Sequence, residues 1–487
     1  MLQKIQQEWF SNVRSDILSG IVVALALIPE SIAFSIIAGV DPMVGLYASF
    51  CIAVIIAFVG GRQGMISAAT GAMALLMVPL VKEHGLNYLL AATILTGVIQ
   101  FIFGVCKVAK LMKFIPRPVM IGFVNALCML VFIAQVPHFV GISTLTYIFV
   151  GLTLLIVYVV PRFFTAIPAP LIATVLLTAV AMNWNLDLKT VGDMGSITQT
   201  LPSFLIPNVP FNLETLAIIF PYSLALAIVG LLESLLTASI VDDMTDTSSN
   251  KNKEARGQGI ANVITGFFGG MAGCAMIGQT VINVKSGGRG RLSTFVTGVF
   301  MLFLIIVLGD WVVQIPMPVL AGIMLVVCIG SFDWSSFTYL RKAPKPDALV
   351  MLTTVSMVVV THDLSKGVIA GVLMSALFFV AKISKIKVTQ TQDGTKQVFL
   401  VEGQLFFAST SSFINAFDLN SHGQEIIIDF SNAHVWDDSG VGAIDKVIIK
   451  YQENGNQVSL IGLNSSSQKL VDQLAVYDKN GKLAAHS

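Results

Sequence analysis

Long runs of apolar residues, separated by short polar segments, fill the chain up to about residue 382. A membrane-spanning helix needs about 20 mostly apolar residues, so the pattern predicts a polytopic α-helical membrane protein. Two runs, 68–82 and 275–284, are too short to cross a membrane alone. We expect 14 transmembrane segments in all, near 16–38, 43–59, 68–82, 87–105, 117–140, 143–160, 168–183, 214–240, 258–270, 275–284, 293–309, 317–330, 347–361 and 364–381.

The pattern changes after the polar stretch "KISKIKVTQTQDGTKQ". Strand-like segments at 396–403, 425–430 and 457–462 then alternate with helix-like segments at 408–418, 439–455 and 465–474. Strands that alternate with helices predict a small α/β layer fold. We therefore expect a transmembrane domain over 1–384 and a separate soluble domain over 388–487.

Composition agrees with a membrane protein, because 55% of the 487 residues are hydrophobic and only 12% are charged. Soluble domains average about 25% charged residues. The net charge of +1 gives no indication of a nucleic-acid partner. The five cysteines lie in apolar segments without the spacing of metal ligands, and no P-loop or catalytic triad is visible. We expect a protein that is not an enzyme and that carries no cofactor and no metal.

Basic residues are distributed unevenly between the loops. Loops on the side of the N-terminus carry many of them, including Arg62, Lys251 and Arg289, whereas the opposite loops carry only Lys82, Lys189 and Lys366. Positively charged loops stay in the cytosol. The start of the chain is polar and has no cleavable signal peptide. The expectation is a multi-pass protein of the plasma membrane with its N-terminus and soluble domain in the cytosol.

The apolar part divides into two similar halves, near 12–183 and 212–382. The first helix of each half carries a Glu-Ser pair, Glu30-Ser31 and Glu233-Ser234. Downstream of each pair lie a glycine pair and a short segment rich in small residues, "GGRQGMISAATGAMALL" and "GGMAGCAMIGQTVINVKSGGRGR". Because seven segments per half is an odd number, the second half is inserted upside down, which makes a 7+7 inverted repeat of the kind found in secondary transporters.

Two short helices at matched points of such a repeat can meet head to head at the middle of the membrane. Their first N–H groups have no intrahelical acceptor, and the helix dipoles place partial positive charge there. That arrangement binds anions without a lysine or arginine. Small residues also serve close helix packing, but their placement at matched points of both halves favours a ligand site.

The motifs "NVRSDILSGIVVALALIPESIAFSIIAGVDPMVGLYASF", "SAATGAMALL" and "GGMAGCAMIGQTVINVKSGGRGRLS" resemble the sulphate permease (SulP) family of anion transporters. The stretch "DFSNAHVWDDSGVGAI" looks like the STAS domain appended to such permeases. The resemblance covers nearly the whole chain. It implies a uracil-permease-like fold with a core domain and a gate domain, and substrates such as sulphate, bicarbonate, chloride or dicarboxylates.

By motif, the resemblance assigns the two acids to different roles. Glu30 and Phe34 would line the anion pocket, and Glu233 and Thr237 would hold the coupling ion. The family's sodium-coupled bicarbonate pattern has an aspartate where this chain has Glu233, and the position of Ile277 lacks a hydroxyl. This departure favours a proton over sodium. The other pocket residues implied are Thr70, Gly71, Ala72, Met73, Ala275, Met276 and Ile277.

Several of these residues could have a purely structural role instead of a functional one. Glu30 could instead satisfy backbone groups freed by Pro29, and the Thr237 hydroxyl could bond its own helix. By resemblance Ser439 is the possible phosphorylation site of the STAS domain, but we expect it to cap the following helix. The domain would then support homodimer formation or trafficking.

The expected function is proton-coupled, secondary-active transport of inorganic or small carboxylic anions by an elevator-like motion within the lipid bilayer. The alternatives are an uncoupled anion channel or exchanger on the same scaffold and sodium-coupled bicarbonate uptake. A membrane-anchored signalling protein would need no matched broken helices. A nucleobase permease would need more polar side chains in its pocket.

Overall fold

The computed structural model describes residues 2–163, 167–195, 197, 199–393 and 396–476. They form two compact units that divide between Val372 and Leu373. The first unit is helical and the second contains the larger sheet.

The first unit contains sixteen α-helices and two short strands among the described residues, and the last helix continues into the second unit. The α-helices are α1 (Leu2–Trp9), α2 (Val13–Ala38), α3 (Pro42–Val59), α4 (Gly71–His84), α5 (Leu86–Val105), α6 (Arg117–Gln135), α7 (Thr144–Val159), α8 (Ala169–Asn183), α9 (Leu213–Thr245), α10 (Lys251–Phe267), α11 (Ile277–Lys285), α12 (Arg291–Val313), α13 (Met317–Ser331), α14 (Ser335–Lys342), α15 (Lys345–Thr361) and α16 (Leu364–Ile383). The strands are β1 (Ser67–Ala69) and β2 (Gly273–Ala275), and the 3-10 turns are η1 (Val108–Phe114), η2 (Val136–His138), η3 (Val160–Arg162) and η4 (Val191–Asp193).

Each of the 14 apolar segments expected from the sequence corresponds to one helix of this unit, from α2 to α16 with the short α14 left over. Within the described residues, nine helices are long and apolar enough to cross a membrane, and α8 is a shorter apolar helix. The helices α4 and α11 have 14 and 9 residues, so neither is long enough to cross by itself. The number of membrane crossings therefore stays a prediction.

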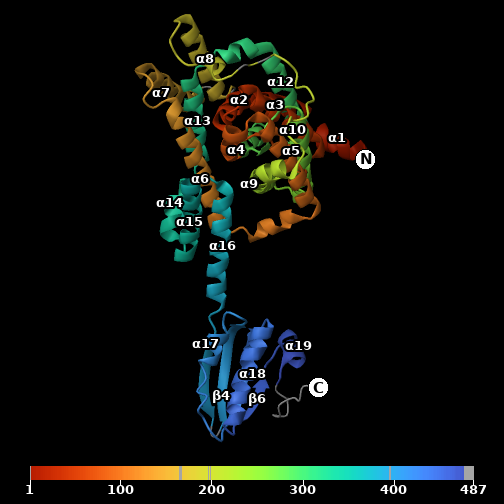
Figure 1. The fold of residues 1–487 in the computed structure, drawn as a ribbon, viewed down its shortest axis with the longest axis vertical. Coiled ribbons are helices and arrows are strands. Elements are labelled where there is room, and N and C mark those ends of the chain that lie inside the picture. The colour runs from red at the N-terminus through yellow and green to blue at the C-terminus, as the bar shows by residue number, and fades with distance from the viewer. Residues whose placement is uncertain (1, 164–166, 196, 198, 394–395, 477–487) are drawn as a thin grey trace. The chain divides into compact units, whose positions relative to one another are not determined.

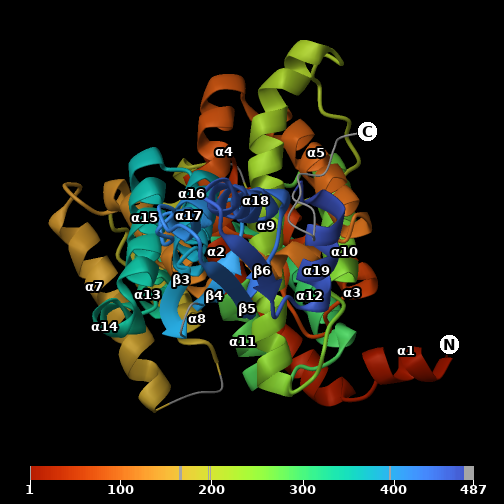
Figure 2. The same cartoon turned by 90° about the horizontal axis from the view of Figure 1, so that it is seen from below.

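The helices pack into two groups (Figures 1 and 2). The core group comprises α2–α5 and α9–α12, in which α10 packs on α5 and α3, and α12 packs on α2 and α3. The gate group comprises α6–α8 and α13–α16, in which α13 contacts α6 and α7, and α15 contacts α6. Each group takes helices from both halves of the chain, which is how an inverted repeat places its two halves side by side.

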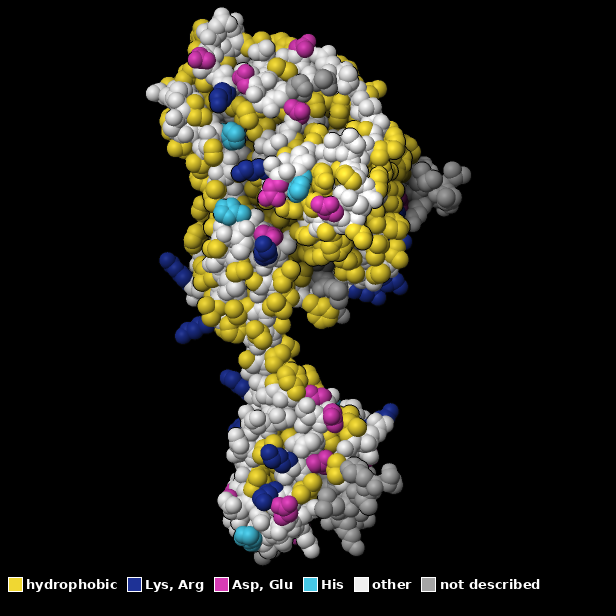
Figure 3. Space-filling model, viewed as in Figure 1, with side chains coloured by type: hydrophobic (Ala, Val, Ile, Leu, Met, Phe, Trp, Pro, Cys, Tyr) yellow, Lys and Arg dark blue, Asp and Glu magenta, His cyan; other side chains and the backbone are white. Residues whose placement is uncertain are grey.

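Apolar side chains cover much of the outward surface of the helices (Figure 3). Examples are Tyr147, Ile148 and Leu155 on α7 and Phe303 and Val307 on α12, all of which are exposed. A soluble monomer rarely exposes contiguous apolar patches larger than a few hundred Å². This surface is suited to contact with lipid.

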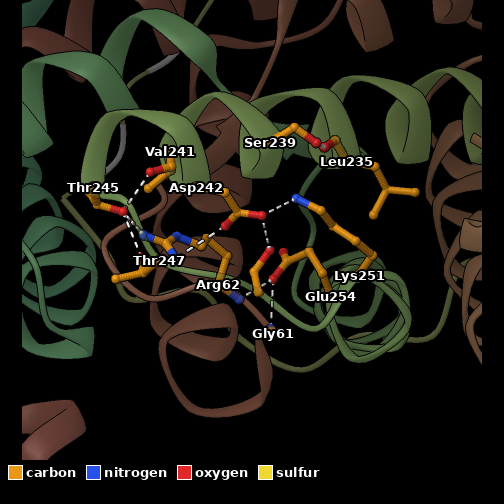
Figure 4. A network of polar contacts seen from close by, with 11 residues as sticks. Gly61, Arg62, Leu235, Ser239, Val241, Asp242, Thr245, Thr247, Lys251 and Glu254 are labelled. Carbon is orange, nitrogen blue, oxygen red and sulfur yellow. Dashed lines mark hydrogen bonds and ion pairs between the residues drawn. The ribbon is translucent and has the colours of Figure 1, made fainter. Parts of the chain in front are cut away.

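A polar network ties the loop after α3 to the end of α9 and the start of α10 (Figure 4). Asp242 pairs with Arg62 at 3.1 Å and with Lys251 at 2.7 Å. The buried Glu254 accepts hydrogen bonds from the backbone N–H groups of Gly61 (2.7 Å) and Arg62 (2.9 Å). The network therefore fixes the segment that leads into β1.

The second unit has a four-stranded sheet in the order β3-β4-β5-β6. The outer pair β3–β4 is antiparallel, whereas β4–β5 and β5–β6 are parallel. Its core is built around Phe399, Phe413, Phe430 and Tyr451. The elements are β3 (Lys387–Asp393), β4 (Lys396–Leu405), α17 (Thr410–Ile414), β5 (Glu425–Val435), α18 (Asp438–Glu453), β6 (Gln457–Ile461) and α19 (Ser465–Leu474).

One expectation for this unit is wrong. Ser439 does not cap α18: the N-cap is Asp437, whose side chain accepts a hydrogen bond from the N–H of Gly440 at 2.9 Å. Ser439 lies inside the first turn of the helix and is exposed. Two acidic residues precede it in the sequence "WDDSG", and the first of them takes the capping position because its carboxylate reaches the free N–H.

Candidate anion site

A short antiparallel strand pair brings the two halves of the chain together at the starts of α4 and α11. In β1 and β2, Ser67 is opposite Ala275 and Ala69 is opposite Gly273. Helix α4 follows β1 directly with Thr70 as its N-cap, and α11 follows β2 directly with Met276 as its N-cap. The two helix starts expected from the matched small-residue segments are therefore neighbours in the fold.

Side chains from neighbouring helices hold the outer edges of this strand pair. The Ser49 hydroxyl of α3 accepts a hydrogen bond from the N–H of Ala69 at 3.2 Å. Asn262 of α10 bonds both the N–H (2.9 Å) and the carbonyl (3.0 Å) of Gly273. The Ser234 hydroxyl of α9 accepts from the N–H of Ala275 at 3.0 Å. Because backbone groups must be paired inside a membrane protein, these contacts make the two-stranded pair possible.

The start of α4 is closely covered. A Cβ atom added to Gly71 would lie 2.9 Å from the Phe34 ring of α2 and 3.1 Å from Val131 of α6. Ala72 and Met73 are fully buried, and the thioether of Met73 lies against Gly230 of α9. Position 71 requires glycine because the Phe34 ring of the core helix α2 and Val131 of the gate helix α6 both lie against it.

The start of α11 is more open. Ile277 is half-buried and Gly278 is exposed, and a Cβ atom added to Gly278 would meet no other atom within 4 Å. The N–H of Met276 is bonded to the carbonyl of Ile66 at 2.9 Å. The next N–H groups of the first turn have no acceptor within the helix. A small anion would therefore find free donors at α11, beside an accessible surface.

Each buried glutamate is connected to one of the two helix starts. The side chains of Glu30 of α2 and of Gln279, in the first turn of α11, interact with one another. Glu233 of α9 accepts a hydrogen bond from the Cys274 thiol at 3.0 Å, and Cys274 Sγ lies 3.2 Å from the Thr70 hydroxyl at the start of α4. The acid of the first half is thus connected to the short helix of the second half, and the acid of the second half to the short helix of the first.

Both acids are deeply buried, with exposed fractions of 6% for Glu30 and 8% for Glu233. Burying an ionised carboxylate is costly unless it is paired or protonated. Oε2 of Glu30 has no hydrogen-bond partner among the described residues. Pro29 lies inside the continuous helix α2. An unpartnered buried oxygen on Glu30 is compatible with a carboxylate that holds a proton or faces a ligand.

Three of the residues named from the sequence have other neighbours. The Thr237 hydroxyl donates to the carbonyl of Glu233, one turn back on the same helix, at 2.7 Å. Ala275 packs against Met65 and Ala238. Ser439 belongs to the second unit and is exposed.

Sequence reasoning missed Cys274, Gln279, Ser49 and Asn262. Cys274 looked like any other cysteine in an apolar segment, and Ser49 lies in an apolar helix without a motif around it. Gln279 is the one of these four residues whose place in the sequence could have indicated a role at the site, because it falls in the first turn of the short helix α11.

The first unit has two surface hollows, and neither is lined by the residues that the sequence analysis assigned to the anion site. One, of about 570 Å³, lies beside Lys110 and the loop around Ser249, and the other, of about 220 Å³, lies between His138, Lys189 and Met317. No cluster of His, Cys, Asp or Glu side chains suited to a metal ion occurs in the part of the chain that the structure describes.

Known proteins share both the sequence and the fold. YbaR of Bacillus subtilis (strain 168), named as a candidate sulfate transporter, is 62% identical over 97% of this chain and 99% of its own length. The bicarbonate transporter BicA of Picosynechococcus sp. is 25% identical over 96% of this chain and 92% of its own. The murine anion transporter Slc26a9 in its inward-facing state matches with a TM-score of 0.84 at 18% identity, over 99% of this chain and 90% of its own, a likeness of fold alone.

The family patterns cover both parts of the chain. The pattern of the sulfate permease family matches residues 13–150 and 143–354, and that of the STAS domain matches residues 387–487. The transmembrane domain of a cyanobacterial BicA matches with a TM-score of 0.65 and 27% identity, over 75% of this chain and 98% of its own. The chain belongs to the sulfate permease family of anion transporters and carries a C-terminal STAS domain.

Proposed function

We propose that the protein is a proton-coupled, secondary-active transporter of small inorganic or carboxylic anions of the sulfate, bicarbonate or dicarboxylate class. The anion binds between the starts of α4 and α11, and the core group moves against the gate group in an elevator-like step. Glu30 and Phe34 line the site together with the helix starts. Glu233 carries the coupling proton. The proposal extends the family assignment to a mechanism.

The observation that carries the proposal is the connection of one buried glutamate to each of the two helix starts. The helix starts favour an anion through their free N–H groups and dipoles. A carboxylate close to a bound anion repels it unless the carboxylate is protonated or paired with a cation. Anion and proton therefore bind more favourably together than separately, and this coupling is reciprocal.

A proton fits the ligand set better than sodium. Sodium needs several oxygen ligands, but Ile277 offers no side-chain oxygen at the start of α11. The group bonded to Glu233 is the Cys274 thiol, a poor ligand for a hard cation. A buried carboxylate needs no further ligand to bind a proton.

We further propose that the protein lies in the plasma membrane as a homodimer, with its N-terminus and STAS domain in the cytosol. Basic loops such as the one with Arg62 and the one with Arg289 support this orientation through the positive-inside rule. The proposed domains are 1–384 for the transporter and 388–487 for the STAS domain, with Ser439 as a possible phosphorylation site because it is exposed.

The test is uptake into proteoliposomes of sulfate, bicarbonate, fumarate and chloride, with and without imposed pH and sodium gradients. The proposal expects saturable uptake of at least one anion and accumulation against its gradient when the outside is acidic. Flux that neither saturates nor goes uphill would identify an uncoupled channel, and exchange without net accumulation an exchanger. Accumulation that requires sodium would replace the proton by sodium. No transport of any of the four anions would refute the proposal.

A further inference from the structure

Three buried side chains form a continuous row from α9 to the start of α4. Glu233 Oε2 lies 3.0 Å from Cys274 Sγ, and Cys274 Sγ lies 3.2 Å from Thr70 Oγ1. Thr70 is the N-cap of α4 and accepts a long hydrogen bond from the N–H of Met73 at 3.5 Å. Cys274 is fully buried, and Thr70 is 2% exposed. Water therefore does not replace the protein partners of these groups.

The direction of hydrogen bonding along this row depends on the charge of Glu233. An ionised carboxylate only accepts, so the Cys274 thiol donates to Glu233. The single thiol proton is then used, and the Thr70 hydroxyl donates its own proton to Cys274 Sγ. In this state Thr70 has no proton left to donate to an anion at the start of α4.

Protonation of Glu233 reverses the row. The new carboxyl O–H donates to Cys274 Sγ, the thiol turns and donates to Thr70 Oγ1, and the Thr70 hydroxyl is released as a donor. The only covalent change is the new O–H bond of Glu233, whose proton comes from solution; the thiol and hydroxyl groups rotate about their single bonds. Either direction fits the contact between Thr70 and Cys274, because each of these atoms can be the donor.

We propose that Cys274 is a positioning residue that passes the protonation state of Glu233 to the Thr70 hydroxyl, so that protonation adds one hydrogen-bond donor for the anion. The inference rests on the proposed proton-coupled transport and names how the proton and the anion affect one another. The thiol is suited to this role because it is both a weak donor and a weak acceptor, and so turns without a large penalty in either direction.

The charged groups named below, on α9 and on the helices packed against it, have other partners or are exposed, and none of them replaces a hydrogen bond of the Glu233–Cys274–Thr70 row. Cys128 of α6 is the second thiol within electrostatic reach of Glu233. On the packed elements, Glu254 of α10 and Asp242 of α9 itself belong to the network around Arg62 (Figure 4). The charged residues Lys82, Glu83 and His84 at the end of α4 and Lys285 at the end of α11 are exposed. Glu30 is bonded to Gln279 and belongs to the other helix start.

The experiment measures anion exchange by the full-length protein in proteoliposomes at equal pH on both sides, at pH 8 and at pH 6. The probe is radiolabelled sulfate, fumarate or chloride, whichever the wild type exchanges best. For the wild type we expect the half-saturation concentration to fall about fivefold between pH 8 and pH 6, at the low end of typical coupling factors. The variant Glu233→Gln measures the part of this pH dependence that is due to Glu30. In Cys274→Ala we expect the ratio of the two half-saturation concentrations to fall to about the value found for Glu233→Gln. Cys274→Ser should restore the wild-type ratio, because a hydroxyl donates and accepts in the same way as a thiol.

Cys51→Ala is the matched control, because Cys51 is another buried cysteine of the core group and makes no contact in this row. A purely structural loss in Cys274→Ala would weaken binding equally at both pH values and leave the ratio unchanged. An unchanged ratio in Cys274→Ala, or a wild type that exchanges the anion with no pH dependence, would overturn the inference while leaving anion transport intact. A wild type that transports none of the anions would instead refute the proposed function.

Discussion

Thr237 and Glu233 are joined within one helix: the Thr237 hydroxyl donates to the main-chain carbonyl of Glu233 at 2.7 Å. The glutamate side chain points to a different partner, the Cys274 thiol. One turn of α9 therefore presents an acid toward the helix starts while its threonine is used by the helix itself. The two residues that the sequence groups as one coupling site thus make separate hydrogen bonds in the structure.

The first prediction follows from this separation. Thr237→Val removes the hydroxyl and keeps the shape of the side chain. If a proton is the coupling ion, proton-driven anion uptake should stay within about twofold of the wild type. The reason is that a hydroxyl hydrogen bond of this kind contributes only about 1 kcal/mol. Uptake is measured in proteoliposomes with an acidic exterior. Thr237→Ser serves as the control that keeps the hydroxyl. A loss of coupling in Thr237→Val that Thr237→Ser rescues would favour a cation site with sodium as the coupling ion.

The second prediction compares the glycine at the start of α4 with an exposed glycine of α7. Gly71→Ala places a methyl group 2.9 Å from the Phe34 ring, and overpacking of this kind costs about 1–3 kcal/mol. We expect the half-saturation concentration for the anion to rise about tenfold, because 1.4 kcal/mol equals a factor of ten. Gly151→Ala is the matched control, since its added Cβ meets open space and lies outside the proposed site. Equal effects of the two substitutions would contradict the packing described for the start of α4.

The third prediction concerns the segment that leads into β1. Glu254→Ala leaves the backbone N–H groups of Gly61 and Arg62 without their carboxylate acceptor. Hydrogen bonds to a charged group contribute about 1.5–3 kcal/mol each, so the melting temperature in detergent should fall by about 3–6 °C. The control Asp243→Ala removes an exposed acid from the nearby end of α9 and should change melting by less than about 1 °C. If both variants melt like the wild type, the network of Figure 4 does not stabilise the loop.

The fourth prediction concerns the second unit, expressed as residues 385–487. Tyr451 is fully buried, its hydroxyl has no partner among the described residues, and burial raises the pKa of this phenol well above its usual range. The unfolded chain ionises near pH 10 while the folded one does not, so stability is complete below that pH and is lost as the pH rises toward the folded pKa.

Between pH 8 and pH 10.5 the wild-type fragment should therefore lose about 1 kcal/mol more than Tyr451→Phe, which has no group to ionise. Urea unfolding at the two pH values measures the difference, and other titrating groups are common to both proteins. At pH 8 the variant should be at least as stable as the wild type, because it removes an unpaired polar group. A larger alkaline loss in Tyr451→Phe than in the wild type would contradict the burial of this hydroxyl.

Much of the helical framework was predictable because lipid imposes a simple rule on sequence. Runs near 20 apolar residues mark helices, and every one of the 14 expected segments has a helix in the structure. The short segments around Thr70 and Met276 were predictable as helix starts because they repeat at matched points of the two halves. Inverted repetition is visible in the order of residues and needs no knowledge of distances.

Other features depended on contacts that no single segment contains. The strand β3 escaped prediction because "KVTQTQD" is polar on both faces and pairs only along one edge, with β4. The contact between Glu233 and Cys274 links residues 41 positions apart across two helices, and the strand pair that positions Cys274 exists only once both halves are folded. The cap of α18 lies two positions before Ser439, because Asp437 takes the capping role.

The central claim is that proton binding at Glu233 drives anion accumulation. Glu233→Gln mimics the protonated acid permanently, so the variant should still bind and exchange the anion but should lose uphill uptake driven by an inward proton gradient. Glu30→Gln should weaken transport as well, although Gln279 would keep a hydrogen-bond partner. The most direct measurement is therefore accumulation of the anion in proteoliposomes against its own gradient, wild type beside Glu233→Gln, at imposed pH differences. The account predicts proton-driven accumulation by the wild type and only equilibration by the variant; undiminished accumulation by Glu233→Gln would contradict it.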